Sequence, residues 1–144
     1  MGSQRSQLLD IYDKQVRAVL ELAVPVWQPA LTIYESKQIE RVQRSAFYII
    51  LGRDYESYDK ALAFLGREAL EIRRVHLCQK FATKTIKNPR YANWFCSMDK
   101  VPLSQIIIKG HQNRTRFKLQ PVPTRTGRYG KSSVPYMTEI LNSL

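Results

Sequence analysis

The sequence predicts an all-α protein, a small helical bundle of three longer helices and one short helix, followed by a basic, partly irregular C-terminal arm. Three observations support this fold class. Apolar residues recur at three- and four-residue steps over three long segments. Capping residues stand at both ends of the central segment. From about Tyr91 onward the helical periodicity gives way to residues typical of turns and loops. We therefore expect a helical bundle over residues 1–96 and a basic C-terminal extension over residues 97–144.

The first predicted helix covers Gln4 to Val24 and has a broad apolar face opposite its charged residues. That face consists of Leu8, Leu9, Tyr12, Val16, Val19, Leu20 and Ala23. Acidic and basic residues four positions apart, Asp10 with Lys14 and Asp13 with Arg17, are expected to pair. Pro25 lacks a backbone N–H and is expected to end the helix. Residues 26–29 would then form an extended corner in which Trp27 packs between the first two helices, with stacking on a nucleic-acid base as the alternative role of this ring.

The central predicted helix contains the stretch Ile39–Gly52, and the chain around it is expected to hold it in place. Thr32 and Glu35 have the spacing of a capping box, and Gly52 stands where a left-handed C-terminal cap would lie. The helical spacing predicts a packing stripe of Ile39, Val42, Ala46, Ile49 and Ile50. It predicts a neighbouring basic stripe, with an aromatic residue at its end, of Lys37, Arg41, Arg44 and Tyr48.

Two further helices are expected after the central one. The short helix would run from Tyr58 to Leu65, with Ser57 as its N-cap and Gly66 closing it. Its residues Ala61, Leu62 and Leu65 would face the core. The fourth helix would run from Glu68 to Asn88, where Asn88-Pro89 stops it. Its predicted packing stripe comprises Ile72, Val75, Cys78, Ala82 and Ile86, widened by Leu77 and Phe81.

The C-terminal part has weaker patterns and more positive charge. Residues 97–144 contain eight basic and two acidic residues, a net charge of +6. Asn93-Trp94-Phe95 is expected to fold back on the bundle as an apolar clip. Short strands are predicted at Ile106–Ile108 and Thr115–Leu119, an extended arm at Pro121–Ser133, and a short final helix at Val134–Leu144. That helix would place Met137, Ile140, Leu141 and Leu144 on one side.

The composition and the residue spacings exclude several classes of protein. With 144 residues and 44% hydrophobic content, the chain can form a modest core. No apolar run approaches the roughly 20 residues needed to span a bilayer, and residues 1–5 lack the pattern of a secretory signal. We therefore expect an intracellular protein of the nucleus or cytoplasm, without membrane contact. Cys78 and Cys96 are expected to be reduced thiols.

The sequence gives no indication of an enzyme active site. His76 and His111 lie on different predicted elements, and no zinc-ligand spacing, glycine-rich phosphate loop or Gly-x-Ser-x-Gly motif is present in the sequence. Asp54, Glu56 and Asp59 could hold a divalent cation. Acidic residues near a helix N-terminus are, however, expected from the helix dipole alone. We predict no catalytic activity, no cofactor and no metal.

The charge balance instead predicts a polyanionic partner. The chain has 23 Lys and Arg against 12 Asp and Glu, a net charge of +11, which favours RNA or DNA. The candidate contacts on the helices are Lys37, Arg41, Arg44, Arg73, Arg74, Lys80 and Lys84, and those in the tail are Arg114, Arg116, Arg125 and Arg128. If the second and fourth helices lie side by side, the helical cations could contact successive phosphates. In the tail, Phe117 and Tyr129 interleave with the arginines, as in segments that bind single strands. The alternative is a solvated face, with Glu40 pairing with Arg44 and Glu71 with nearby arginines.

Several motifs over about residues 8–95 resemble the region that follows the polymerase core in reverse transcriptases of jockey-like non-LTR retrotransposons. They are Leu9-x-x-Tyr12, Val16-Arg17-x-Val19-Leu20-Glu21, Pro25-Val26-Trp27-x-Pro29, Ile39-Glu40-Arg41-Val42-Gln43-Arg44-x-Ala46, Gly52, Ser57-Tyr58, Ala61-Leu62-x-x-Leu65-Gly66 and Leu70-Glu71-x-Arg73-Arg74.

In that family the region is a helical thumb with a C-terminal extension. The resemblance implies contact with RNA or an RNA–DNA hybrid and no polymerase activity, because the sequence contains no paired aspartates of a polymerase palm. The other interpretation is a helical protein-interaction or self-association module without a nucleic-acid role.

Overall fold

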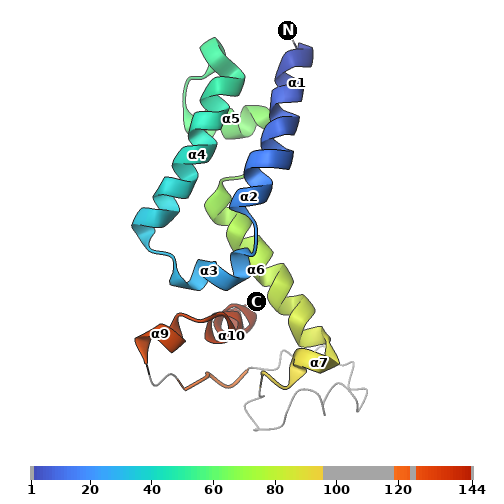
Figure 1. The fold of residues 1–144 in the computed structure, drawn as a ribbon, viewed down its shortest axis with the longest axis vertical. Helices are drawn as coiled ribbons and strands as arrows, with labels where there is room; N and C mark the ends of the chain where they lie inside the picture. Colours follow the sequence, from blue (N-terminus) through green and yellow to red (C-terminus); the bar gives the residue numbers. More distant parts are fainter. Residues whose placement is uncertain (1, 96–118, 124–125, 144) are drawn as a thin grey trace. The chain divides into compact units, whose positions relative to one another are not determined.

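The computed structural model describes residues 2–95, 119–123 and 126–143 (Figure 1). These residues are predominantly helical and include no β-strand, which confirms the all-α fold class. Packing divides the chain into two units. The first contains the residues up to Val24 together with Leu31–Val75, and the second contains Pro25–Ala30 together with the residues from His76 onward. The predicted boundary between residues 96 and 97 lies outside the described residues.

The N-terminal helix ends earlier than predicted. Helix α1 (Gly2–Ile11) continues through a π-helical stretch (Tyr12–Arg17) into α2 (Ala18–Leu20). The chain then turns at Ala23, whose φ of 52° is left-handed and disfavoured for a residue with a Cβ. Pro25 does not end this helix but lies in the first turn of another, α3 (Val24–Trp27), where its missing N–H needs no acceptor. The expected extended corner is therefore wrong, since a 3₁₀ turn (Gln28–Ala30) follows directly.

Helix α4 (Ile33–Leu51) has both predicted caps. The Thr32 hydroxyl accepts a hydrogen bond from the Glu35 backbone N–H at 3.2 Å, and the Glu35 carboxylate accepts one from the Thr32 N–H at 2.8 Å. Gly52 is the C-cap, and its N–H donates to the Tyr48 carbonyl. Its φ of 57° is positive as expected, but its ψ of −117° lies outside the left-handed helical region, a combination that favours glycine.

The capping box should make the stability of the fold depend on pH. Hydrogen bonds from the backbone N–H and the hydroxyl of Thr32 hold the pKa of the Glu35 carboxyl below its ordinary value of 4.5. Because the folded state favours the ionised carboxylate, its contribution is complete above pH 4.5 and is lost as the pH falls through the folded-state pKa. Urea unfolding from pH 7 to pH 3 should therefore show the wild type losing its advantage over Glu35→Gln in the acid range. An advantage that stays constant with pH would contradict this.

The core of the first unit is aromatic and differs from the predicted packing stripe of α4. Tyr12 and Phe47 are buried in contact, with ring centroids 5.4 Å apart in an edge-to-face arrangement. Ile50 and Leu51 complete the buried face, while Val42 and Ile49 are 42% and 69% exposed. The prediction for Val42 and Ile49 is therefore wrong. The buried face of α4 is rotated toward Phe47, which fills the space beside the N-terminal helix.

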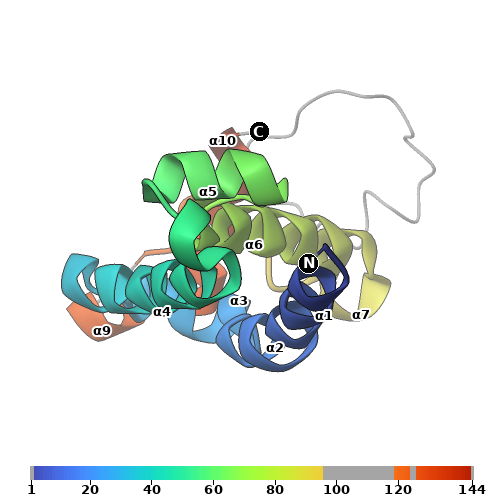
Figure 2. The same ribbon diagram turned by 90° about the horizontal axis from the view of Figure 1, so that it is seen from above.

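Helix α5 (Tyr58–Leu65) matches the prediction at both ends and on its packing face. The Ser57 hydroxyl accepts a hydrogen bond from the backbone N–H of Lys60, and Gly66 is in the left-handed conformation. Its inner residues Ala61, Leu62 and Leu65 join the core around Phe47, as expected. Figures 1 and 2 show α1 alongside α4, with α5 running crosswise to them in the same unit.

Helix α6 (Leu70–Lys87) is slightly shorter than predicted and has a different buried face. Cys78, which forms no disulfide among the described residues, and Ala82 are buried as expected. Ile72 and Phe81 are instead 53% and 44% exposed, so the prediction that they face the core is wrong. The fully buried positions follow a four-residue step and comprise Leu70, Arg74, Cys78 and Ala82. No helix among the described residues has both the length and the apolar character needed to cross a bilayer.

The second unit has a small core of its own. Phe95 packs with Ala82, Leu119 and Met137, so the predicted clip forms through Phe95. Helix α10 (Ser133–Ser143) confirms the final predicted helix and buries Met137 and Ile140. The Asn142 amide exchanges two hydrogen bonds with the Leu119 backbone, at 2.7 and 3.0 Å.

Two other C-terminal predictions have different outcomes. A short helix α9 (Gly127–Gly130) lies within the predicted extended arm, and the Gly130 N–H donates to the Thr126 carbonyl at 3.1 Å to close this turn. The arm is therefore not extended throughout. The predicted strand at 106–108, residues 115–118 of the predicted strand Thr115–Leu119, and Leu144 lie outside the described residues.

Candidate nucleic-acid interface

The predicted basic stripe of α4 forms a continuous exposed row. Lys37, Arg41 and Arg44 are all exposed, and they lie at helical spacing between the exposed rings of Tyr34 and Tyr48. At 1.5 Å per residue the row extends over roughly 20 Å. Tyr34 was missed in the sequence, although its three-residue distance from Lys37 places it on the same face. The row thus has an aromatic residue at each end, and we call these five residues the α4 stripe.

The cations of the α4 stripe have no carboxylate partner within the part of the chain that the structure describes. Arg41 donates to the side-chain oxygen of Gln38 at 3.3 Å. The Arg44 guanidinium lies over the Tyr58 ring, 5.1 Å from its centroid, in a cation–π contact that leaves its charge uncompensated. Three adjacent positive charges therefore face solvent.

The expected pairing of Glu40 with Arg44 is not formed. The Glu40 carboxylate instead accepts hydrogen bonds from the Tyr58 hydroxyl and from the backbone N–H groups of Leu70 and Glu71, the last two at 3.0 and 3.2 Å. These amides are at the start of α6, where the helix dipole favours a negative charge. Burial, followed by the hydrogen bond to Glu40, raises the pKa of the Tyr58 hydroxyl, which therefore remains a donor. Glu40 thus joins α4, α5 and α6.

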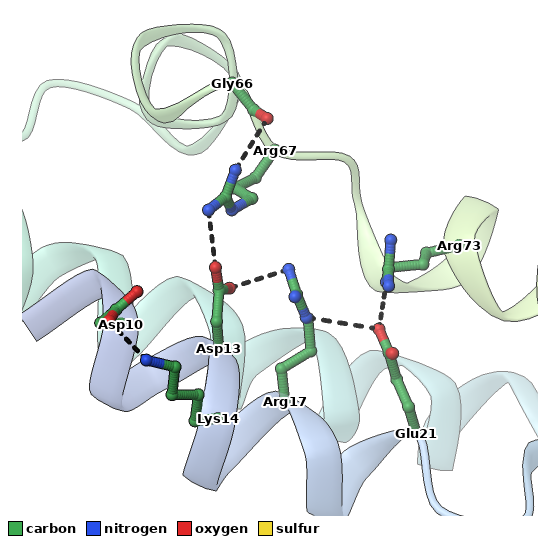
Figure 3. A network of polar contacts seen from close by, with 8 residues as sticks. All are labelled: Asp10, Asp13, Lys14, Arg17, Glu21, Gly66, Arg67 and Arg73. Atoms are coloured by element: carbon green, nitrogen blue, oxygen red, sulfur yellow. Dashed lines mark hydrogen bonds and ion pairs between the residues drawn. The ribbon is translucent and has the colours of Figure 1, made fainter. Parts of the chain in front are cut away.

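The predicted contact Arg73 is neutralised within the first unit. Figure 3 shows it in a network in which its Nε atom pairs with the Glu21 carboxylate. Asp13 in the same network pairs with Arg17 at 2.8 Å and with Arg67 at 2.6 Å. The hydrogen bond to Glu21 raises the pKa of Arg73. The charge of Arg73 is therefore compensated, but by Glu21 and not by Glu71, the carboxylate that the alternative named.

Arg74 cannot serve as a surface contact in this structure. Its side chain is 0% exposed, and its Nη2 atom donates to the Ser36 hydroxyl at 2.6 Å. It lies on the inner face of α6, between the buried residues Leu70 and Cys78. The prediction that Arg74 contacts phosphate is therefore corrected, because a phosphate could reach it only if the core opened.

The remaining predicted cations are distributed as follows. Lys80 and Lys84 are exposed and belong to the second unit, so a continuous phosphate track over α4 and α6 stays a prediction. Arg128 is exposed on α9. Arg114, Arg116 and Arg125 lie outside the described residues, as do Phe117 and the side chain of Tyr129.

A polar cavity of about 360 Å³ lies in the first unit beside the network of Figure 3, lined by Tyr12, Arg17, Gln43, Gly66, Arg67, Glu68 and Arg73. Each of its three guanidinium groups pairs with a carboxylate, Arg17 and Arg67 with Asp13 and Arg73 with Glu21, and the carboxylate of Glu68 also lines the cavity. Burial raises the pKa of the Tyr12 hydroxyl. This cavity thus provides no excess of positive charge for a polyanion.

Two of the three acidic residues considered for a cation, Asp54 and Glu56, are engaged in ion pairs. Asp54 pairs with Arg5 at 2.5 Å, and Glu56 pairs with Lys60. The described residues contain no group of three or more His, Cys, Asp or Glu side chains arranged to hold a metal ion.

Comparison of the chain with protein-family models, with curated proteins and with solved structures finds no match.

Proposed function

We propose that this chain is a non-catalytic nucleic-acid-binding module that contacts the backbone of RNA or of an RNA–DNA hybrid. The observation that carries the proposal is the α4 stripe, where three exposed cations lie side by side without carboxylate partners. Such a row suits electrostatic contact with consecutive phosphates, which gives affinity without sequence selection. The exposed rings of Tyr34 and Tyr48 at its ends could stack on bases or sugars.

The hydrogen bonds made by the nearby acidic residues support this proposal. Helix α4 contains Glu35 and Glu40, and either could have neutralised the stripe. Glu35 is instead occupied in the capping box, and Glu40 caps α6. Arg73 by contrast is paired with Glu21. The α4 stripe is therefore a selective excess of charge at one face and not merely a reflection of the basic composition.

The resemblance to the thumb region of a retroelement reverse transcriptase favours RNA or a hybrid as the ligand and an intracellular site of action. A second candidate function is a helical protein-interaction or self-association module. Exposed apolar side chains favour it, since Ile33, Ile49 and Phe64 are each about 70% exposed or more. In that case the apparent molecular mass in solution should rise with protein concentration. The affinity for RNA should then not change with salt concentration.

Reversal of the α4 stripe should test the proposed function. In K37E/R41E/R44E we expect RNA and hybrid affinity at low salt to drop by at least about tenfold. The plot of log affinity against log salt should become less steep, with its absolute slope reduced by roughly 2 to 3, because each phosphate contact releases nearly one counterion. Fluorescence anisotropy with labelled RNA, hybrid and DNA duplex over a salt series measures both quantities.

The matched control reverses the same number of charges elsewhere. K14E/R53E/K60E changes three exposed cations of the first unit that lie outside the α4 stripe. Its RNA affinity should stay well above that of the stripe variant, with circular dichroism confirming that both remain helical. Equal losses in the two variants, or a wild type that does not bind at low salt, would overturn the proposal.

A further inference from the structure

The second unit contains an exposed aromatic groove of about 310 Å³, lined by Phe81, Lys84, Thr85, Asn88, Tyr91 and Trp94. Phe81 is 44% exposed and Trp94 52% exposed, a large apolar surface to leave in water. The Tyr91 and Trp94 rings contact each other, with centroids 5.0 Å apart. We call these six residues the aromatic groove.

Local structure explains how the aromatic groove is built. Helix α6 ends at Lys87, and Asn88 caps the following short helix α7 (Pro89–Ala92) by accepting from the Arg90 N–H at 3.0 Å. The backbone N–H of Trp94 donates a hydrogen bond to the backbone carbonyl of Tyr91 at 3.0 Å, and this turn folds the chain back. Phe95 is anchored in the core of this unit, so the neighbouring Trp94 is held at the surface.

The surroundings of the groove are positively charged without compensation. Residues 76–95 include Lys80, Lys84, Lys87 and Arg90 but no acidic residue. Among the residues that the structure describes, no carboxylate pairs with any of these four cations. Lys84 itself lines the groove. An aromatic surface with Lys84 in its lining and three further cations within the same stretch of the chain is complementary to a ligand that combines flat rings with negative charges.

We infer that the aromatic groove binds an unpaired nucleobase of a single-stranded nucleic acid. Trp94 and Phe81 would stack on the base, while Lys84 would contact an adjacent phosphate. A duplex cannot satisfy this site, because its bases are already stacked and paired. This inference rests on the proposed function and adds to it a preference for single strands.

The polar groups of the groove also predict how selective it is. The Thr85 hydroxyl donates to the Phe81 carbonyl at 2.8 Å, and the Asn88 side-chain oxygen is occupied by the Arg90 N–H. Neither the Thr85 proton nor the Asn88 oxygen is therefore available to read the edge of a base. Binding should depend on stacking, which every base provides, and should show little sequence preference.

The test measures single-strand and duplex affinities of the full chain with substitutions in the groove. We expect Trp94→Ala and Phe81→Ala each to weaken binding of oligouridylate by roughly 5- to 100-fold. Duplex RNA affinity should change by less than about twofold. Trp94→Phe should retain most of the affinity, because it preserves stacking. Lys84→Ala should lower the salt slope by about 1, whereas Trp94→Ala should leave it unchanged.

A fluorescence experiment and a matched variant complete the test. In a Trp27→Phe background, Trp94 is the remaining tryptophan, and its emission should be quenched on addition of oligouridylate. Phe64→Ala removes another exposed aromatic ring, in α5, and should leave single-strand binding unchanged.

The outcomes separate this inference from the proposed function. If oligouridylate binds and Trp94→Ala behaves like Phe64→Ala, the inference is wrong while the α4 stripe proposal stands. If K37E/R41E/R44E has no effect but Trp94→Ala weakens binding, the groove is supported and the stripe is not. If Trp94→Ala abolishes self-association and leaves RNA binding intact, the groove is a protein interface and the inference is overturned. No binding to any nucleic acid overturns both.

Discussion

Phe47→Ala should destabilise the protein by about 3–5 kcal/mol, the usual effect of removing a buried aromatic side chain. Phe47 is 0% exposed and contacts Tyr12 edge-to-face, with Tyr58 on another side at a centroid distance of 6.3 Å. Deleting the ring leaves a void among helices that cannot easily collapse. Since small domains are stable by only about 5–15 kcal/mol, much of the stability would be lost. Urea unfolding followed by circular dichroism measures the change.

The matched substitution for Phe47→Ala is Ile49→Ala on the same helix. The periodicity of the sequence predicts Ile49 in the core, whereas the structure exposes 69% of it. We expect Ile49→Ala to change the free energy of unfolding by less than about 0.5 kcal/mol. A larger effect at Ile49 than at Phe47 would show that the packed face of α4 is the one predicted from periodicity.

Glu40→Ala should be the second most damaging substitution, with a loss of about 2–4 kcal/mol. The change removes the carboxylate that accepts hydrogen bonds from two backbone N–H groups at the start of α6 and from the Tyr58 hydroxyl. A lost cap costs about 1 kcal/mol, and a hydrogen bond to a charged group contributes about 1.5–3 kcal/mol. Thermal and urea unfolding of the purified variant measure the loss.

Three companion variants resolve what Glu40 contributes. Glu40→Gln keeps an acceptor without the charge and should lose less than Glu40→Ala. Tyr58→Phe removes one of the three hydrogen bonds and should cost about 1–2 kcal/mol. Glu56→Ala breaks the exposed pair with Lys60 and should cost less than about 1 kcal/mol. If Glu40→Ala were no worse than Glu56→Ala, the junction of α4, α5 and α6 would not depend on this carboxylate.

The parts of the fold that the sequence predicted well depend on nearby residues. The capping box of Thr32 and Glu35 and the Ser57 and Gly66 caps involve groups within four residues of each other, so their spacing is visible in the sequence. The exposure of Lys37, Arg41 and Arg44 follows from helical periodicity and from the cost of burying charge. These features require no knowledge of the tertiary partners.

The features that were missed depend on distant residues. Glu40 caps a helix that begins 30 positions later, and Arg74 is buried against Ser36, 38 positions earlier. The rotation of α4 toward Phe47 depends on Tyr12. None of these partners lies within the window in which helical periodicity can be recognised.

In the candidate binding surfaces, too, the features that depend on nearby residues were predicted and those that depend on distant residues were missed. The α4 stripe could be read from one helix, but Arg73 was wrongly assigned because Glu21 lies 52 residues away. In Asn93-Trp94-Phe95 the sequence indicated an apolar clip. It did not indicate that Phe95 would be buried and Trp94 half exposed, which makes the aromatic groove.

The uneven distribution of ion pairs gives ionic strength two opposing effects on the chain. In the network of Figure 3, Asp13 and Glu21 attract arginines, and mobile ions that screen this attraction weaken it. Around α6 and α7, Lys80, Lys84 and Lys87 repel one another, and the same ions relieve that repulsion. Concentrated salt should thus loosen the network of Figure 3 while making the region around α6 and α7 easier to keep folded, and it would weaken the electrostatic attraction of the α6 and α7 cations for a polyanion.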